Sequence, residues 1–383
     1  MIGWELPPFN SGGLGVACFY LAKELSQLVE DLTFTLPIKL NITSPPFKVL
    51  FAIPSNNNQS KPKRLESYFH KNFYFNSQIL DLIFGYHKRI LLNYKTKPTI
   101  VHGHDWFTAP AVYSLSKHYR TPSLVHVHST EIERTNENPN QFIFDIEKKY
   151  FQKVDYLLPV SDLTKNVLID DYKIKPEKIF VVPNGFFWSE NKGEMPNYLA
   201  ELKKDGWKIV LFVGRLTIQK GPDYLIRAIP MIINKQPKTK FVFVGSGDMF
   251  PQLVKLAYEL KVEKYISFAN FLREEKLWGV YQNADVLVMP SVNDPFGLVP
   301  LEALNNNLAP VISKTTGMGY YLNNILRFDF WDIKEMANKI LGILNYETLK
   351  KTYLNNCKAE AQKKFCWQKT ANQINNIYYK IIK

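Results

Sequence analysis

The sequence contains few cysteines and no long apolar run. Cys18, Cys357 and Cys366 share no CxxC spacing and leave one thiol over in any disulfide scheme, so we expect reduced thiols. No apolar run approaches the roughly 18 residues that a bilayer crossing needs. The first residues, MIGWELPPFN, lack the basic stretch and long apolar stretch of a secretory signal. Together these features predict a cytoplasmic protein.

Two common enzyme motifs are also missing. The glycine turn at 12–15 lacks the GxGxxG spacing of a nicotinamide site, and no G-x-S-x-G elbow supports a Ser-His-Asp hydrolase. The net charge of +13 would suit an anionic partner, but the basic residues are scattered and lysine accompanies abundant asparagine and isoleucine. We therefore expect no nucleic-acid partner. Peripheral membrane association stays open as an alternative.

Short apolar runs alternate with longer periodic stretches, which predicts an α/β fold. At 383 residues the chain exceeds what one hydrophobic core usually spans, so we expect two domains. The alternation is typical of βα units around parallel sheets. The expected strands are 32–38, 47–53, 99–104, 123–128, 155–160 and 178–183 in the first half, and 208–213, 239–245, 265–270, 285–290 and 309–313 in the second.

The polar segment from Ser189 to Asp205 separates two doubly wound, Rossmann-like domains. Such sheets bind ligands beyond the carboxyl ends of their strands, so functional residues are expected there. In the first domain, we expect the strand that normally comes just before the glycine turn at 12–15 to be missing. The expected divisions are an N-terminal domain at 1–188, a C-terminal domain at 206–364, and a final helix at 365–383 that packs back on the first domain.

Two segments have the chemistry of a phosphate site. Arg215 and Lys220 lie where a strand ends and a helix begins, so two cations, free backbone N–H groups and the positive end of a helix dipole come together. This combination suits a diphosphate, although two solvated surface cations would have the same sequence. Gly12 and Gly13 precede a helical stretch, where the backbone can closely approach a phosphate or an acceptor.

The segment SVNDPFGLVPLEAL contains two carboxylates eight residues apart. Asp294 lies in a loop before a helix and Glu302 lies inside that helix. A carboxylate can accept hydrogen bonds from vicinal hydroxyls, which suits a ribose or a hexose. The alternative is a helix-capping Asp294 and a surface Glu302. Backbone N–H groups for a phosphate or sugar are offered by Phe296, Gly297 and Leu298.

All seven histidines lie in the first third of the chain, and four form two HxH pairs, His102 with His104 and His126 with His128. In a strand, the two members of each pair share a face. Pairs from neighbouring strands could converge as zinc ligands, or the rings could be hydrogen-bonded core residues. We favour a contact of His128 with a sugar hydroxyl or a backbone carbonyl, and we expect no metal.

Taken together, the motifs resemble those of the retaining GT-B glycosyltransferases of the group 1 family, in particular bacterial glycogen (starch) synthases. The resemblance covers nearly the whole chain and implies two Rossmann-like domains facing across a cleft. The matching segments are GWELPPFNSGGLG, HGHDWFTAPA, VHVHSTEIER, VVPNG, FVGRLTIQKGPDYL, FVGSGDM, MPSVNDPFGLVPLEAL and FCWQKTA.

The resemblance implies transfer of a hexose, most simply glucose, from a nucleotide diphosphate sugar to a glycan acceptor. Arg215 and Lys220 would hold the donor diphosphate, Glu302 the ribose, and Asp294 would replace the family's glutamate at the hexose. His128 would contact the hexose near the reacting carbon. The family retains the anomeric configuration and needs neither a metal nor a cofactor, because cations and a helix terminus neutralise the leaving diphosphate.

The same resemblance places Gly12 and Gly13 in a loop that closes over donor phosphate and acceptor. It also implies that the donor is an ADP- or UDP-sugar. The chain departs from the family's pattern at Asp294, at Tyr320 where a glutamate is common, and before Gly12, where glycogen synthases have a lysine. Two other functions share the architecture: a degenerate domain that binds nucleotide sugar without turnover, and a nucleotide-sugar 2-epimerase.

Overall fold

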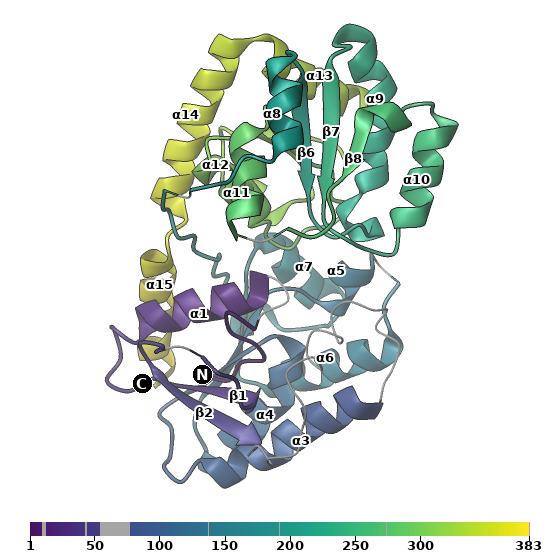
Figure 1. The fold of residues 1–383 in the computed structure, drawn as a ribbon. Coiled ribbons are helices and arrows are strands. Elements are labelled where there is room, and N and C mark those ends of the chain that lie inside the picture. The colour runs from purple at the N-terminus through teal and green to yellow at the C-terminus, as the bar shows by residue number, and fades with distance from the viewer. Residues whose placement is uncertain are drawn as a thin grey trace. The chain divides into compact units, whose positions relative to one another are not determined.

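The chain folds into two compact units (Figure 1). The first comprises Met1–Phe187 and Phe365–Lys383, and the second comprises Trp188–Lys364. These bounds lie close to the expected 1–188, 206–364 and 365–383. The computed structural model describes residues 1–9, 13–42, 44–53, 77–136, 138–190, 192–272 and 274–382.

The first unit is built on parallel strands. The backbone of Ile2 bridges β1 on one side and β3 on the other, which gives the order β2, β1, Ile2, β3, β4, β5. If Ile2 is counted as the first strand, this is the 3-2-1-4-5-6 order of doubly wound folds. The strands are β1 (Thr33–Ile38), β2 (Lys48–Ile53), β3 (Val101–His104), β4 (Ser123–Val127) and β5 (Tyr156–Pro159).

The sequence interpretation expected the first strand to be missing. Among the described residues no regular strand precedes α1, but the backbone of Ile2 takes the place of that strand between β1 and β3. The Ile2 N–H donates to the His102 carbonyl at 2.7 Å and the Gly3 N–H donates to the Thr35 carbonyl at 2.9 Å. The side chain of Ile2 is buried. Residues 1–3 are enough to form hydrogen bonds with both β1 and β3, and β3 itself has only four residues.

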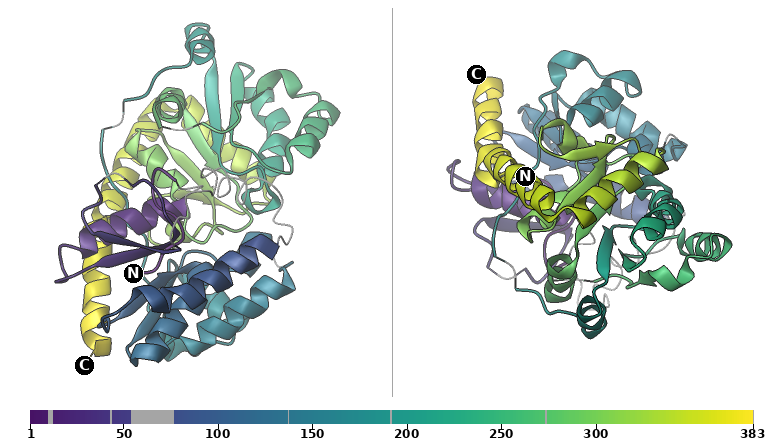
Figure 2. Two further views of the ribbon diagram at one scale, coloured as in Figure 1. Left: turned by 60° about the horizontal axis from the view of Figure 1, so that its bottom comes forward. Right: turned by 90° about the horizontal axis from the view of Figure 1, so that it is seen from above.

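Helices cover both faces of the first sheet. One apolar cluster contains residues of α3, α4 and α6, and a second contains residues of α1 and α15. The C-terminal helix α15 lies against α1 (Figures 1 and 2) and buries Trp367, Ala371, Ile374 and Tyr378, spaced as on one helix face. The helices are α1 (Gly13–Leu25), α3 (Ser77–Asn93), α4 (Asp105–Tyr119), α5 (Glu131–Thr135), α6 (Gln141–Lys153), α7 (Asp162–Asp170), the 3-10 turn η1 (Pro176–Lys178) and α15 (Trp367–Ile382).

The second unit is a six-stranded parallel sheet in the order β8, β7, β6, β9, β10, β11, again the 3-2-1-4-5-6 order. Its strands are β6 (Lys208–Val213), β7 (Thr239–Val244), β8 (Ile266–Phe268), β9 (Val286–Met289), β10 (Pro310–Ser313) and β11 (Leu326–Phe328). Its helices are α8 (Asn197–Lys204), α9 (Pro222–Lys235), α10 (Phe250–Glu259), α11 (Glu274–Asn283), α12 (Val299–Asn305), α13 (Ile333–Asn345) and α14 (Glu347–Lys364), with 3-10 turns η2 (Ile218–Lys220), η3 (Glu263–Tyr265) and η4 (Gly317–Tyr320).

The structure differs from the expected elements in two places. The run 178–183 is not a regular strand: Ile179 forms one isolated bridge with Leu157, although Phe180 and Val182 still donate backbone hydrogen bonds to β5. The three-residue strand β11 was not expected. Within the part of the chain that the structure describes, no helix combines the length and apolar character needed to cross a membrane.

Candidate active site

The strand order of the second unit reverses between β6 and β9, and ligands of doubly wound folds bind at this switch point. Arg215 follows β6, is exposed, and donates from Nη2 to Oε1 of Gln219 at 2.8 Å. Lys220 is the last residue of η2, directly before the start of α9. Both predicted diphosphate residues therefore lie where the strand order predicts a ligand.

Gly221 lets the loop that carries Lys220 pack against the end of β9. Its φ is 61°, and a Cβ at this position would lie 2.2 Å from the carbonyl oxygen of Pro290. Any side chain would therefore meet both backbone strain and a backbone clash. The close approach fixes the loop from which Lys220 extends.

Lys220 and Asp294 form an ion pair, with Nζ 2.5 Å from Oδ2 and side chains only 18% and 8% exposed. The Oδ1 of Asp294 accepts the backbone N–H of Phe296 at 3.3 Å. Backbone hydrogen bonds to Thr315 and from Gly317 hold Asp294 on both sides. Two predicted site residues are thus in contact, and an anion that binds Lys220 competes with Asp294 for it.

The remaining predicted residues of this unit surround α12. Glu302 accepts a hydrogen bond from the hydroxyl of Tyr281 at 2.7 Å, and burial raises the pKa of Glu302. Gly297 has a φ of 90°, and a Cβ there would lie 2.7 Å from a threonine methyl carbon. The ring of Phe296 is buried in the core, so its backbone is the part that can meet a ligand, whereas Leu298 is half-buried before α12.

In the first unit, His128 lies directly after β4 and is held by Asp105. The carboxylate of Asp105, a buried residue with a φ of 57° at the start of α4, accepts the backbone N–H of His128 at 2.6 Å and of Ser129 at 3.4 Å. Burial lowers the pKa of His128 to about 3 and raises the pKa of Asp105 to about 6. At neutral pH, His128 is therefore an uncharged imidazole.

His128 is one end of a row of four stacked histidine rings on the same face of β3 and β4. Ring centroids lie 4.9 Å apart for His102 and His104 and 4.5 Å apart for His126 and His128. His102, His104 and His126 each offer a ring nitrogen within 4.8 Å of the others, as do Cys18, His104 and His128 with the cysteine sulfur. Burial keeps the rings neutral, as metal ligands must be, so these groups could hold zinc.

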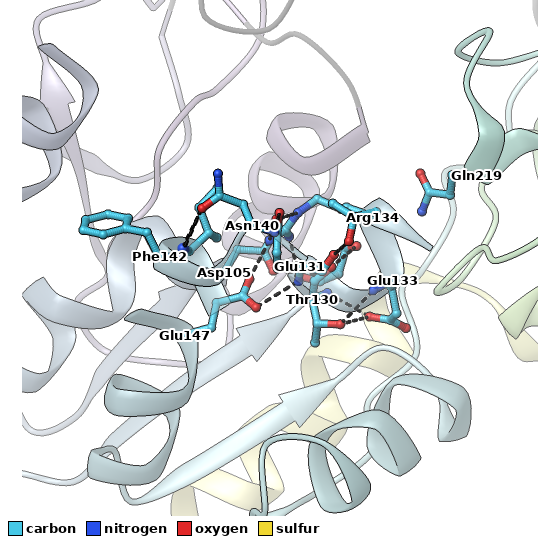
Figure 3. A network of polar contacts seen from close by, with 12 residues as sticks. Asp105, Thr130, Glu131, Glu133, Arg134, Asn140, Phe142, Glu147 and Gln219 are labelled. Carbon is cyan, nitrogen blue, oxygen red and sulfur yellow. Dashed lines mark hydrogen bonds and ion pairs between the residues drawn. The ribbon is translucent and has the colours of Figure 1, made fainter. Parts of the chain in front are cut away.

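A buried polar network fixes the segment that follows β4 (Figure 3). Arg134 pairs through Nη2 with Glu147 at 2.5 Å and Glu131 at 3.2 Å, and its Nη1 donates to the carbonyl of Ser129 at 2.7 Å. Thr130 caps α5 in a capping box. Glu147 is fully buried, and a buried carboxylate needs a charge partner, which Arg134 supplies. The network holds Ser129, the residue after His128.

Several positioning residues received no role in the sequence interpretation. Asp105 had a signal, since it follows His104 in HGHDW, and Arg134 follows Glu131 by three residues in a helix. Tyr281, the partner of Glu302, had none. Gly13 begins α1 and is exposed, whereas Gly12 lies outside the described residues.

Comparisons with known proteins agree with the fold. The profile of the family "Glycosyl transferases group 1" matches residues 197–364, and that of "Glycosyltransferase Family 4" matches 11–186. An uncharacterised glycosyltransferase of Methanocaldococcus jannaschii is 28% identical over 99% of this chain and 97% of its own length. A glycogen synthase of Mycobacterium tuberculosis is 25% identical over 83% of this chain and 78% of its own length.

Solved structures share the fold. Sucrose-phosphate synthase from Thermosynechococcus elongatus superposes with a TM-score of 0.77 at 18% identity, covering 99% of this chain and 98% of its own. An Anabaena protein, solved in complex with UDP-glucose, gives a TM-score of 0.72 at 17% identity and 99% coverage of both chains. These comparisons define a glycosyltransferase of the GT-B type. The chain belongs to the group 1 glycosyltransferases and resembles the glycogen and starch synthases among them.

Proposed function

We propose that this enzyme transfers a hexose, glucose in the simplest case, from an ADP- or UDP-sugar to a glycan acceptor with retention of configuration. The observation that carries the proposal is the position of Arg215 and Lys220 at the switch point of the second sheet, at the start of α9. The glycogen synthase of Mycobacterium tuberculosis and the UDP-glucose complex of the Anabaena protein support the donor class.

Each predicted residue keeps the role that the family resemblance gives it. Arg215 and Lys220 bind the diphosphate, and two cations with a helix terminus stabilise the leaving group without a divalent metal ion or other cofactor. Glu302 binds the ribose and Asp294 a hydroxyl of the hexose. His128 binds the hexose near the reacting carbon.

The loop that contains Gly12 and Gly13 closes over the donor phosphate and the acceptor. Backbone N–H groups of Phe296, Gly297 and Leu298 complete the contacts to the donor. Retention follows from attack on the face that the diphosphate leaves, with a leaving-group oxygen taking the acceptor proton.

A product assay tests this proposal. ADP-glucose, UDP-glucose and UDP-GlcNAc are each incubated with glycogen, short maltooligosaccharides and lipid extracts in excess EDTA. We expect transfer from at least one donor, and Lys220→Ala should lower kcat/KM by at least roughly 100-fold, the usual effect of removing one charge-stabilising donor. Lys235→Ala, an exposed lysine at the far end of α9, is the matched control and should leave the rate unchanged.

Three results would redirect the assignment. Sugar epimerisation without any acceptor would identify a 2-epimerase. Nucleotide binding without turnover on any pair would identify a degenerate binding domain, to which the departures at Asp294 and Tyr320 point. Turnover that EDTA abolishes and zinc restores would assign the histidine row to a metal.

A further inference from the structure

The imidazoles of His104 and His128 contact each other directly. Nδ1 of His104 lies 3.2 Å from Nε2 of His128. Burial lowers the pKa of both rings, so each carries a single ring proton at neutral pH. One nitrogen of the pair must therefore donate and the other must accept, and this choice fixes the tautomer of both rings.

The surroundings of His104 determine which nitrogen donates. Its other nitrogen, Nε2, is buried and has no hydrogen-bond partner among the described residues. If His104 carried its proton there, a buried N–H would be left without an acceptor, whereas the alternative leaves only a lone pair unpaired. Orphaned buried N–H groups are the rarer and costlier defect. His104 therefore carries its proton on Nδ1 and donates to His128.

Two neighbouring histidines follow the same rule. Nε2 of His126 lies 3.3 Å from the carbonyl oxygen of Val182, which can only accept, so His126 is protonated on Nε2 and its buried, unpaired Nδ1 carries a lone pair. Nδ1 of His102 bonds the hydroxyl of Tyr378 at 2.6 Å, and its unpaired nitrogen is Nε2. Each buried ring can thus engage its N–H and leave only a lone pair unpaired.

We propose that His104 is a positioning residue that holds His128 in the Nδ1–H tautomer, so that His128 presents an N–H donor to its ligand. The backbone of His128 is already fixed by Asp105, and His128 is the one half-buried ring of the row. With Nε2 accepting the hydrogen bond from His104, the other ring nitrogen, Nδ1, carries the proton and the ring has no free lone pair. His128 then donates to an oxygen and does not act as a base. That this oxygen belongs to a hexose rests on the proposed function.

Nitrogen-15 NMR of ring-labelled histidine tests the tautomers without any substrate. The chain has seven histidines, so the spectrum is simple and each signal can be assigned from single variants. At neutral pH we expect Nδ1 to be protonated in both His104 and His128. His104→Phe should release His128 to the Nε2–H form or to a mixture. In His104→Asn, the side-chain amide can take the place of Nδ1–H and should preserve the Nδ1–H form.

His102→Phe is the matched control, because His102 shares the strand and face of His104 but has no hydrogen bond to His128. It should leave the tautomer of His128 unchanged. In the product assay, His104→Phe should lower kcat by about tenfold with little change in the KM of the donor, and His104→Asn should recover most of the loss, as expected for one hydrogen bond.

Three outcomes would overturn the proposal: an Nε2–H form of His128 in the wild type, an unchanged tautomer in His104→Phe, or ring nitrogens bound to a stoichiometric metal. If the variants fail to fold, the protonation sites of His104 and His128 in the wild type decide. The spectra need no turnover, so absence of hexosyl transfer would overturn the proposed function and leave the tautomer assignment standing.

Discussion

Lys220 forms an ion pair with Asp294, and this ion pair competes with the binding of a diphosphate to Lys220. Asp294 holds the lysine at 2.5 Å, and its negative charge also repels an incoming diphosphate. Asp294→Asn keeps the shape of the side chain and removes the charge, so UDP or ADP should bind about fivefold more tightly. The hexose contact weakens, however, and kcat should fall by about 100-fold. Calorimetric titration and initial rates measure the two effects separately.

The control for this variant is Asp329→Asn, which removes the partner of Lys314 on the exposed surface of the same unit. Its effect on both quantities should be small, because exposed ion pairs contribute little. Weaker nucleotide binding in Asp294→Asn would contradict the competition between Asp294 and the diphosphate.

Substitutions at Gly221 and Gly206 distinguish the effect of a steric clash from the effect of backbone strain. Both have positive φ, 61° and 76°, but a Cβ at 221 meets the carbonyl oxygen of Pro290 at 2.2 Å, whereas nothing lies within 4 Å at 206. Gly206→Ala should therefore cost about 1 kcal/mol of stability and leave activity intact. Gly221→Ala should displace Lys220 and lower kcat/KM by at least about tenfold. Equal effects of the two variants in urea unfolding and in the rate assay would refute this distinction.

The histidine row of β3 and β4 makes the stability of the first unit sensitive to acid. Burial lowers the pKa of all four rings below the ordinary 6.5, so the unfolded chain binds protons below this pH that the folded chain does not. Stability is therefore fully present above about pH 6.5 and falls as the pH drops, by up to about 1.4 kcal/mol per pH unit for each ring. Asp105 and Glu133, whose pKa values burial raises to about 6 and about 7, partly oppose this trend because they take up protons in the folded state.

His126→Phe isolates one ring of the row. Between about pH 7.5 and about pH 5.5, the wild type should lose roughly 1 kcal/mol more stability than the variant, because the variant lacks one proton-binding group in its unfolded state. Urea unfolding at the two pH values measures the difference. His118→Phe, which removes a histidine at an exposed position, is the control. A parallel loss in wild type and His126→Phe would show that the ring is protonated in the folded state.

Elements with a strong sequence pattern were predicted well, and elements held by their neighbours were not. The apolar runs at 208–213 and 239–245 correspond to β6 and β7, which are buried on both faces. Ile2 could not be recognised as a bridging residue, because its pairing depends on β1 and β3 and not on a run of its own. The three-residue β11 is an edge strand with no distinctive pattern.

In the candidate site, too, features with a local sequence pattern were predicted and contacts between distant residues were not. Local spacing placed Arg215 and Lys220 at a strand-to-helix junction, which the structure contains. The pairing of Lys220 with Asp294 joins residues 74 positions apart, and no periodicity encodes it. The hydrogen bond from Tyr281 of α11 to Glu302 of α12 likewise joins two separate elements and could not be predicted from either segment alone.

The chain leaves the first unit after Phe187 and returns to it at Phe365, so the stability of that unit depends on a helix that is distant in sequence. Ile374 of α15 is fully buried in the apolar cluster that contains Ala17, Leu21 and Leu25 of α1. Ile374→Ala should destabilise the first unit by about 2–5 kcal/mol through lost burial and the resulting cavity. Asn376→Ala, exposed on the same helix, should change stability by less than about 0.5 kcal/mol.

Scanning calorimetry can assign this loss to one unit, because the second unit has its own sheet and its own apolar cluster. We expect Ile374→Ala to lower one transition and leave the other in place, since Ile374 contributes to the core of the first unit alone. A reference variant for the second unit is Leu211→Ala, at a fully buried position of β6, which should move the other transition. If both variants shift a single transition together, the two units unfold as one cooperative body, and α15 stabilises the whole molecule through its place in the first core.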